Sequence, residues 1–112
     1  MMSTIFDKII AKEIPSDIVF ENDRIIAIKD INPVAPIHIL ILPKKPIKDL
    51  QSIENEDLAL IQEIVSVAKE IAIQNGISDG YRLLTNNGPL AGQTIFHLHF
   101  HLIGGKKLGA MA

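Results

Sequence analysis

Three histidines, His97, His99 and His101, alternate with large apolar residues near the end of the chain. Side chains along a β-strand alternate between its two faces, so residues 95–103 are predicted to form one strand with the three imidazoles in a row. The other face would carry the intervening apolar residues and pack into the core; these are Phe96, Leu98, Phe100 and Leu102. Because histidine titrates near neutral pH, this row suits metal binding, proton transfer or nucleophilic attack.

Metal binding is the first chemistry that such a row suggests, since imidazole is a common metal ligand. A strand rises ~3.3 Å per residue, which places the Cα atoms of His97 and His101 about 13 Å apart, whereas Zn–N bonds are only about 2.0–2.1 Å long. Two of the three imidazoles could share an ion, with His38, an aspartate or water completing the coordination. No HExxH pattern accompanies them. We therefore expect neither a metal nor another cofactor.

Nucleophilic attack on phosphorus is the second possibility. A histidine side chain ordinarily has a pKa of about 6.5, so at pH 7 the neutral imidazole presents a lone pair that can attack phosphorus and form an intermediate that water later cleaves. His99 is best placed, because imidazoles flank it on both sides. Residues 92–94, Gly-Gln-Thr, could direct N–H groups toward a phosphate. If one nitrogen of His99 attacks, the other must hold its proton toward an acceptor, most simply a backbone carbonyl.

The third interpretation is that these histidines are only polar residues on the exposed face of a half-buried strand. A single histidine there would carry no information. Here the fourth histidine of the chain, His38, begins another predicted strand, so all four are expected to gather in one region. This concentration favours a functional site.

Four further strands are predicted from runs rich in β-branched residues, at 18–21, 24–29, 38–42 and 81–85. Asn22-Asp23 would join the first two as a hairpin. The run 38–42 is apolar throughout, which predicts a central strand buried on both faces. A stiff loop containing Pro33 and Pro36 precedes it, and a glycine-containing loop, 86–94, leads into the histidine strand.

Two helices complete the predicted fold. The first spans residues 4–11, with Ser3 or Thr4 as its cap and Asp7 in a capping box. The second spans 55–74, with Asn55 as its cap and Gly76 as its stop. Its apolar stripe comprises Leu58, Ile61, Ile64, Val65, Ala68, Ile71 and Ala72, while Leu60, Val67 and Ile73 lie off this stripe and suit a partner subunit. The order of elements predicts an α+β fold, a five-stranded, largely antiparallel sheet with both helices on one face.

Composition limits the possible classes of protein. The 112 residues fit a single domain over 1–112. No apolar run approaches 18 residues and no basic leader precedes one, so we expect a soluble protein without membrane contact. The chain has no cysteine, which fits the cytoplasm. A net charge of −2 and only one tyrosine beside four phenylalanines argue against nucleic acid as a partner.

Residues 97–103 have the form His-φ-His-φ-His-φ-φ, with φ apolar, and resemble the motif that names the histidine triad (HIT) family. The similarity extends over nearly the whole chain, at 4–10, 30–38, 42–45 and 91–96, and looks like the histidine triad nucleotide-binding (Hint) branch. It implies a homodimer whose two sheets join into one, with a purine nucleotide such as AMP or GMP bound to each subunit. It also implies a metal-free phosphoramidase, which cleaves nucleotidyl-amine conjugates to the nucleoside monophosphate through a covalent nucleotidyl-histidine.

The resemblance also implies roles for individual residues. His99 would be the nucleophile, His101 would bind the α-phosphate, and His97 and His38 would orient and support this array. Asp30 would accept hydrogen bonds from the ribose hydroxyls, as an acceptor-only carboxylate can. The base would lie in an apolar slot formed by Ile5, Phe6, Ile9, Ile28 and Ile31. Contacts to the phosphate and the leaving group would come from Asn86, Gly92, Gln93 and Thr94.

Plainer alternatives stand beside these roles. The apolar residues of 4–11 also fit a core-facing stripe, Asp30 could only begin the proline turn, and Asn86 and Gln93 could only satisfy loop backbone. The chain also departs from the family pattern at Pro89 and Leu90, and its tail, 106–112, lacks the tryptophan of some relatives. Two other functions stay open: a dinucleoside polyphosphate hydrolase of the same superfamily, and a non-catalytic nucleotide- or zinc-binding interaction module.

Overall fold

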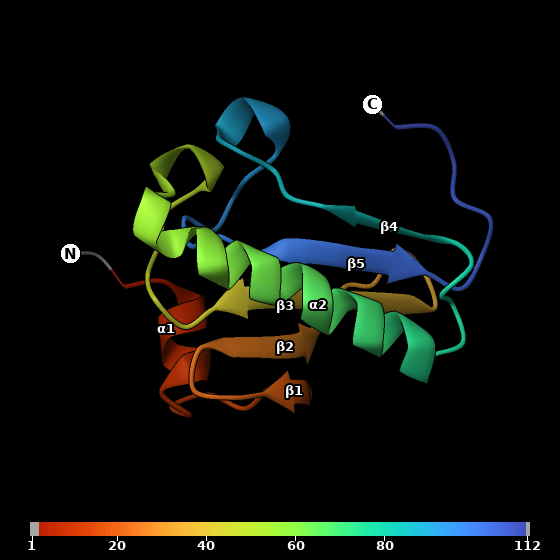
Figure 1. Cartoon of the computed structure of the whole chain (residues 1–112), viewed down its shortest axis with the longest axis horizontal. Coiled ribbons are helices and arrows are strands. Elements are labelled where there is room, and N and C mark those ends of the chain that lie inside the picture. Colours follow the sequence, from red (N-terminus) through yellow and green to blue (C-terminus); the bar gives the residue numbers. More distant parts are fainter. Residues whose placement is uncertain (1–2, 112) are drawn as a thin grey trace.

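Five extended segments form one sheet in the computed structural model, which describes residues 3–111 (Figure 1). The strands are β1 (Ile18–Glu21), β2 (Ile25–Lys29), β3 (Ile37–Pro43), β4 (Tyr81–Leu84) and β5 (Phe100–Gly104), in the spatial order β1-β2-β3-β5-β4. Every neighbouring pair is antiparallel. With two helices, α1 (Ile5–Ile10) and α2 (Leu58–Gln74), this arrangement confirms the predicted α+β class and the central place of β3. Among residues 3–111, no helix is both long and apolar enough to cross a membrane.

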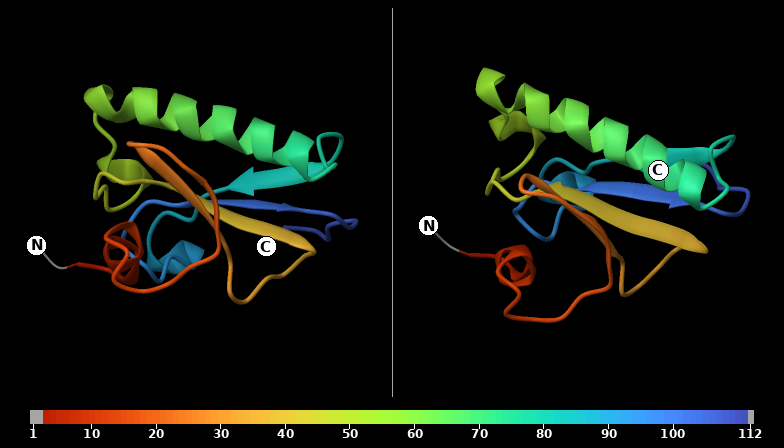
Figure 2. Two further views of the ribbon diagram at one scale, coloured as in Figure 1. Left: turned by 90° about the horizontal axis from the view of Figure 1, so that it is seen from below. Right: turned by 60° about the horizontal axis from the view of Figure 1, so that its bottom comes forward.

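The two helices lie on opposite faces of the sheet, so the expectation that both pack on one face is wrong (Figure 2). Side chains of a strand alternate between its faces. In β2, Ile25 and Ala27 therefore pack with α2, while Ile26 and Ile28 pack with α1. The central strands need cover on both sides because they are apolar on both sides.

Helix α1 begins as the sequence predicts. The Thr4 hydroxyl accepts from the Phe6 N–H at 3.2 Å, and Asp7 Oδ2 accepts from the Thr4 N–H at 2.7 Å. Phe6 and Ile9 are the buried residues of this short helix, and they hold it against the sheet face that carries the cavity described below.

Helix α2 begins three residues later than predicted. Residues 55–57 form a 3-10 turn whose cap is Glu54, not Asn55, because the buried carboxylate of Asp57 accepts from the Glu54 N–H at 3.0 Å. Gly76 follows the helix with a φ of 69°, as a glycine stop requires. The buried stripe is also rotated from the predicted one. Val67 lies in the core, whereas Leu58, Val65 and Ile73 are exposed and form a separate apolar stripe.

The histidine strand is shorter than predicted, because β5 begins only at Phe100. Phe100 pairs with Ile41 of β3, and beyond this pair the chain leaves the ladder. The Leu98 N–H donates instead to the Ile47 carbonyl at 2.7 Å. Pro43 and Pro46 lack the N–H groups that would extend β3 alongside residues 95–99. Only His101 of the three histidines therefore lies in a strand.

Candidate active site

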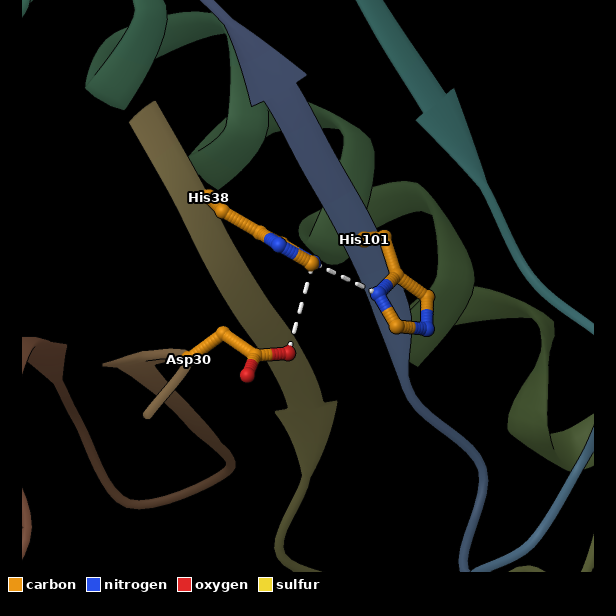
Figure 3. Close-up of side chains that lie close together, drawn as sticks. All are labelled: Asp30, His38 and His101. Atoms are coloured by element: carbon orange, nitrogen blue, oxygen red, sulfur yellow. Dashed lines mark hydrogen bonds and ion pairs between the residues drawn. The ribbon is translucent and has the colours of Figure 1, made fainter. Parts of the chain in front are cut away.

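The pairing of β3 with β5 brings His38 and His101 together. Leu40 lies opposite His101, and His38 is two residues before Leu40, so both imidazoles project from the face that carries α1. Figure 3 shows His38 reaching from β3 toward His101 on β5, with the Asp30 carboxylate nearby. His38 is 7% exposed and His101 is half-buried.

A chain of hydrogen bonds fixes the protons of this pair. The Val34 N–H donates to His38 Nδ1 at 3.1 Å, so the ring proton of neutral His38 must be on Nε2. That proton faces His101 Nδ1, 2.9 Å away, and Asp30 Oδ2, 3.4 Å away. Since His101 Nδ1 accepts, the proton of neutral His101 must be on Nε2. His101 therefore presents an N–H donor from its outer nitrogen.

His99 has the opposite tautomer. Its Nδ1 lies 2.7 Å from the carbonyl oxygen of His97, and a carbonyl can only accept, so Nδ1 carries the proton. This leaves an in-plane lone pair on Nε2. The Thr85 hydroxyl donates to the His99 carbonyl at 2.7 Å and holds this irregular backbone in place. His99 is thus oriented as the sequence predicts for a nucleophile, with a backbone carbonyl as its acceptor.

His97 does not stand in a row with the other two histidines. Its ring is 1% exposed, and its Nε2 donates to the Pro43 carbonyl at 2.7 Å. The predicted row fails here because residues 95–99 are not a strand and do not alternate in a regular way. His97 contacts His99 through its backbone carbonyl, and both rings pack against Phe6, whose ring lies 6.0 Å from His97 and 5.0 Å from His99.

Burial lowers the pKa values of the two half-buried histidines, His99 and His101. Desolvation holds the pKa of His99 below its ordinary value of 6.5. Desolvation, and then the like charges that His99 and His38 would carry, lower the pKa of His101 to about 4. The Asp30 carboxylate opposes both shifts without overcoming them. Both imidazoles are therefore neutral at pH 7, as the hydrogen-bond pattern requires.

A cavity of about 300 Å³ opens beside these two histidines. All five residues of the predicted base slot line it, and so do Asp30, Thr94, His99 and His101. Its other walls come from Lys29, Asn32, Leu40 and Ile95. The lining thus combines apolar side chains with the lone pair of His99, the N–H of His101 and the carboxylate of Asp30. This is the form of a small-molecule site.

Three predicted contact residues, Asn86, Gly92 and Gln93, do not line this cavity. Gln93 is 4% exposed, and its amide is used by the loops: its Oε1 accepts from the Gly88 N–H, and its Nε2 donates to the carbonyls of Lys48 and Ile95. Gly92 has a φ of 94°, which favours glycine, and ends the 3-10 turn Pro89–Ala91. The plainer interpretation, a loop-forming role, therefore fits Gln93, and Gly92 also serves the conformation of the loop.

Asp30 forms the turn contact that the plainer alternative predicts, and its second carboxylate oxygen faces His38. Its Oδ1 accepts from the Asn32 N–H at 2.8 Å, as in an Asx turn, while Oδ2 faces His38. Ligand atoms of Asp30, His38 and His101 lie within 4.8 Å of one another, which makes them a candidate metal-binding group. A metal ligand must present a lone pair, however, and the Val34 N–H keeps the proton of His38 on the nitrogen that faces this group. In this tautomer the three residues do not fit a metal.

Several residues that orient the site escape sequence reasoning, namely Val34, Pro43 and Thr85. Val34 and Pro43 act through backbone groups, for which no side-chain pattern exists. Thr85 ends a predicted strand, and only the fold brings its hydroxyl to His99.

Comparison with known proteins agrees with this geometry. Residues 11–108 match the family model of the HIT domain. The chain belongs to the HIT domain family. The predicted resemblance to the histidine triad family is thereby confirmed, and the HIT motif of this chain is the segment 97–103.

Relatives of this HIT chain cover almost its full length. A maize protein named 14 kDa zinc-binding protein is 47% identical over 109 residues, which cover 94% of this chain and 84% of the maize protein. The structure of a HIT family hydrolase from Clostridium thermocellum is 46% identical, with a TM-score of 0.94 and coverage of 99% and 97%. A histidine triad nucleotide-binding protein from Candida albicans is 34% identical, with a TM-score of 0.77 and coverage of 98% and 85%. The HIT chain thus shares its fold with proteins described as hydrolases.

Proposed function

We propose that this HIT chain is a purine nucleoside phosphoramidase of the Hint type, which releases a nucleoside monophosphate from nucleotidyl-amine conjugates. The observation that carries this proposal is the tautomer of His99. The Nδ1–H of His99 donates to the His97 carbonyl at 2.7 Å, which leaves the lone pair on Nε2. His99 also lines the cavity. The lowered pKa of His99 keeps that lone pair available at neutral pH.

The reaction would proceed in two displacements. His99 Nε2 attacks the α-phosphorus, a P–N bond to His99 forms, and the bond from phosphorus to the amine breaks. The departing amine takes a proton from solvent water, which the attacking water returns to the solvent in the second displacement, and the His97 carbonyl stabilises the positive charge that develops on the His99 ring. Water then attacks the phosphorus, the bond to His99 breaks, and the monophosphate and free His99 result. His101 would donate from Nε2 to a non-bridging oxygen throughout.

The apolar end of the cavity would hold the base. Ile31 is 89% exposed and Ile5 is 48% exposed, although both line the cavity, so a base lying between them would remove apolar surface from water. Asp30 would accept from the ribose hydroxyls, and Thr94 would contact the phosphate. Gly92 and Gln93 would act by shaping the loop of residues 86–94. Asn86 begins this loop, and we assign it no contact with the nucleotide.

We also propose that the chain forms a homodimer, in which β4 pairs with its counterpart and continues the sheet. β4 is an edge strand with four half-buried residues, whereas the opposite edge strand, β1, is interrupted by a register shift between Ile18 and Phe20. Unpaired, regular edges favour strand addition, and bulges oppose it. A second copy could also cover the exposed α2 stripe of Leu58, Val65 and Ile73.

A second candidate function is zinc binding without catalysis. The name of the maize relative and the closeness of Asp30, His38 and His101 support it. The Val34 N–H bond opposes it, because zinc at His38 Nε2 would require that proton to move. The third candidate, a dinucleoside polyphosphate hydrolase, would use the same His99.

One experiment separates these functions. Hydrolysis of adenosine 5′-phosphoramidate and of diadenosine tetraphosphate is measured in parallel, with and without a chelator, for the wild type and for His99→Ala. Cleavage of the phosphoramidate that is lost in the variant supports the proposal. Faster cleavage of the tetraphosphate supports the third candidate. Binding of AMP without cleavage of either compound rejects both hydrolases, and activity that the chelator abolishes indicates a metal.

A further inference from the structure

Phe6 differs from the other residues of α1 that line the cavity beside His99. Ile5, Phe6 and Ile9 all line this cavity, but Phe6 is only 3% exposed, whereas Ile5 is 48% exposed. A bound base would remove much of the Ile5 surface from water, but it would find little of Phe6 left to cover. The surface of the Phe6 ring is therefore already used by other parts of the chain.

The ring of Phe6 packs against two histidine rings. Its centre lies 5.0 Å from that of His99, with an angle of 73° between the planes, and 6.0 Å from that of His97, with an angle of 88°. Near-perpendicular contacts at about 4.5–7 Å are a favoured geometry of aromatic pairs. The His97 ring is itself fixed, because it is 1% exposed and its Nε2 donates to the Pro43 carbonyl at 2.7 Å. Phe6 thus joins a fixed ring to the ring of His99.

The His99 ring needs such a contact. Within residues 3–111 its side chain makes one hydrogen bond, from Nδ1 to the His97 carbonyl, and its backbone precedes the β5 ladder. The torsion that turns an imidazole about its bond to Cβ has broad energy wells, so a single hydrogen bond restrains the ring weakly. The Phe6 ring restricts this rotation, and it has no N–H or O–H that would compete for the lone pair on Nε2.

The start of α1 sets the position of Phe6. The Phe6 N–H donates to the Thr4 hydroxyl at 3.2 Å, and Asp7 completes the capping box. A helix of six residues is not stable in isolation, so α1 depends on this cap and on the packing of Phe6 and Ile9 against the sheet. The cap therefore places the Phe6 ring against His99.

We propose that Phe6 is a positioning residue for His99. Its ring, supported by the His97 ring, keeps the Nδ1–H of His99 on the His97 carbonyl, so that the lone pair stays on Nε2. The buried side chain of His97 thereby gains a role that its backbone carbonyl does not provide. The effect on catalysis rests on the proposed function, because it requires that His99 attacks phosphorus. Small displacements of a reacting group slow such a step strongly.

Phe6→Leu tests this role, because leucine keeps an apolar side chain and removes the ring. ¹⁵N NMR of the full chain at about pH 8, where imidazoles are neutral, reports the tautomer of His99. We expect the proton on Nδ1 in the wild type and a mixture of both neutral tautomers in the variant. Phe6→Met is the second variant, in case leucine prevents folding, and should give the same mixture. Ile64→Val is the matched control, because Ile64 is fully buried on the opposite face, under α2, and it should keep the wild-type tautomer.

Kinetics separate positioning from base binding. With adenosine 5′-phosphoramidate, we expect Phe6→Leu to lower kcat about 10–100-fold. The Kd for AMP should change by less than about twofold, since little of the Phe6 surface is open to a base. A higher Kd with the wild-type kcat and tautomer would overturn the proposal and make Phe6 a base contact. An unchanged His99 tautomer in Phe6→Leu would also overturn it, whatever the rates. If the wild type cleaves no phosphoramidate, the proposed function fails, and the His99 tautomer still decides the role of Phe6.

Discussion

His38 donates its only ring proton to His101: His38 Nε2 and His101 Nδ1 lie 2.9 Å apart, and the Val34 N–H on the other nitrogen of His38 fixes the direction of this bond. The backbone of the proline loop therefore decides which nitrogen of His101 presents a hydrogen to the cavity. His99, held by a carbonyl instead of an N–H, has the opposite tautomer. One donor and one lone pair thus stand side by side, with ring centres 5.2 Å apart.

Removal of His38 should disturb the N–H donor of His101 without removing the proposed nucleophile, His99. We expect His38→Ala to lower kcat for phosphoramidate hydrolysis about 10–100-fold, the usual cost of losing a residue that orients a catalytic group. ¹⁵N NMR should show that His101 loses its fixed tautomer while His99 keeps its own. His38→Gln, whose amide can donate to His101, should recover part of the activity. A variant with an unchanged His101 tautomer and full activity would contradict this role.

The stability of the protein should depend on His101 in mildly acidic solution. Its pKa in the folded chain is about 4, below the ordinary value of 6.5, so between these pH values the unfolded chain binds a proton that the folded chain does not. The free energy of unfolding therefore falls as the pH falls from 6.5 toward 4. Urea denaturation should show that His101→Gln loses less stability over this interval, by on the order of 1 kcal/mol, since partial solvent exposure of the ring reduces the full effect. Parallel losses in both proteins would exclude His101 as the cause.

The rate of hydrolysis should follow the protonation of His99. Burial lowers its pKa below 6.5, so its lone pair persists at pH values where a free imidazole is already charged. We expect kcat/KM to be level near pH 7 and to decline only below pH 6.5, because protonated His99 cannot attack. A pH profile of kcat/KM between pH 4 and 8 tests this. A decline that begins above pH 7 would show that another group controls the rate.

Local patterns in the sequence predict most of the elements, whereas the apolar end of the cavity is implied by the resemblance to the HIT family. The Thr4 and Asp7 caps need only neighbouring residues, and the run at β3 indicates burial on both faces wherever the strand lies. The slot residues of α1 and β2 are implied by that resemblance, and in the structure they belong to two regular elements that pack together. Even the acceptor of His99 follows from chemistry alone, since an attacking imidazole needs its second nitrogen protonated.

The rest depends on contacts between distant segments. The alternating pattern of 95–103 is that of a strand, but Pro43, the last residue of β3, and Pro46 lack N–H groups, and residues 95–99 have no neighbouring strand to pair with. His97 therefore turns inward to Pro43 instead of joining a row. Gln93 looks like a phosphate ligand in sequence, and only the positions of the Lys48, Gly88 and Ile95 backbones reveal that its amide is already used. The side of the sheet on which α1 packs is likewise a property of the whole fold.

Thr85 should orient His99 through a single hydrogen bond. Its hydroxyl donates to the His99 carbonyl at 2.7 Å. Thr85→Val keeps the shape and removes this donor, which we expect to cost about 0.5–1.5 kcal/mol and to lower kcat by up to about tenfold. Thr85→Ser restores the donor and should recover most of the rate. If valine and serine variants have equal kcat values, the hydroxyl does not position the nucleophile.

Ile31 should bind the base without contributing to folding. It is 89% exposed and lines the cavity, so a base bound there would remove its apolar surface from water. We expect Ile31→Ala to raise the Kd for AMP about fivefold, the effect of losing roughly 1 kcal/mol of apolar burial, with kcat and the melting temperature unchanged. Leu90→Ala is the matched control, because Leu90 is fully exposed and lies outside the cavity lining. Calorimetric titration of AMP into both variants decides the matter: equal Kd values for the two variants would place the base elsewhere, and a lowered melting temperature for Ile31→Ala would indicate a role in packing.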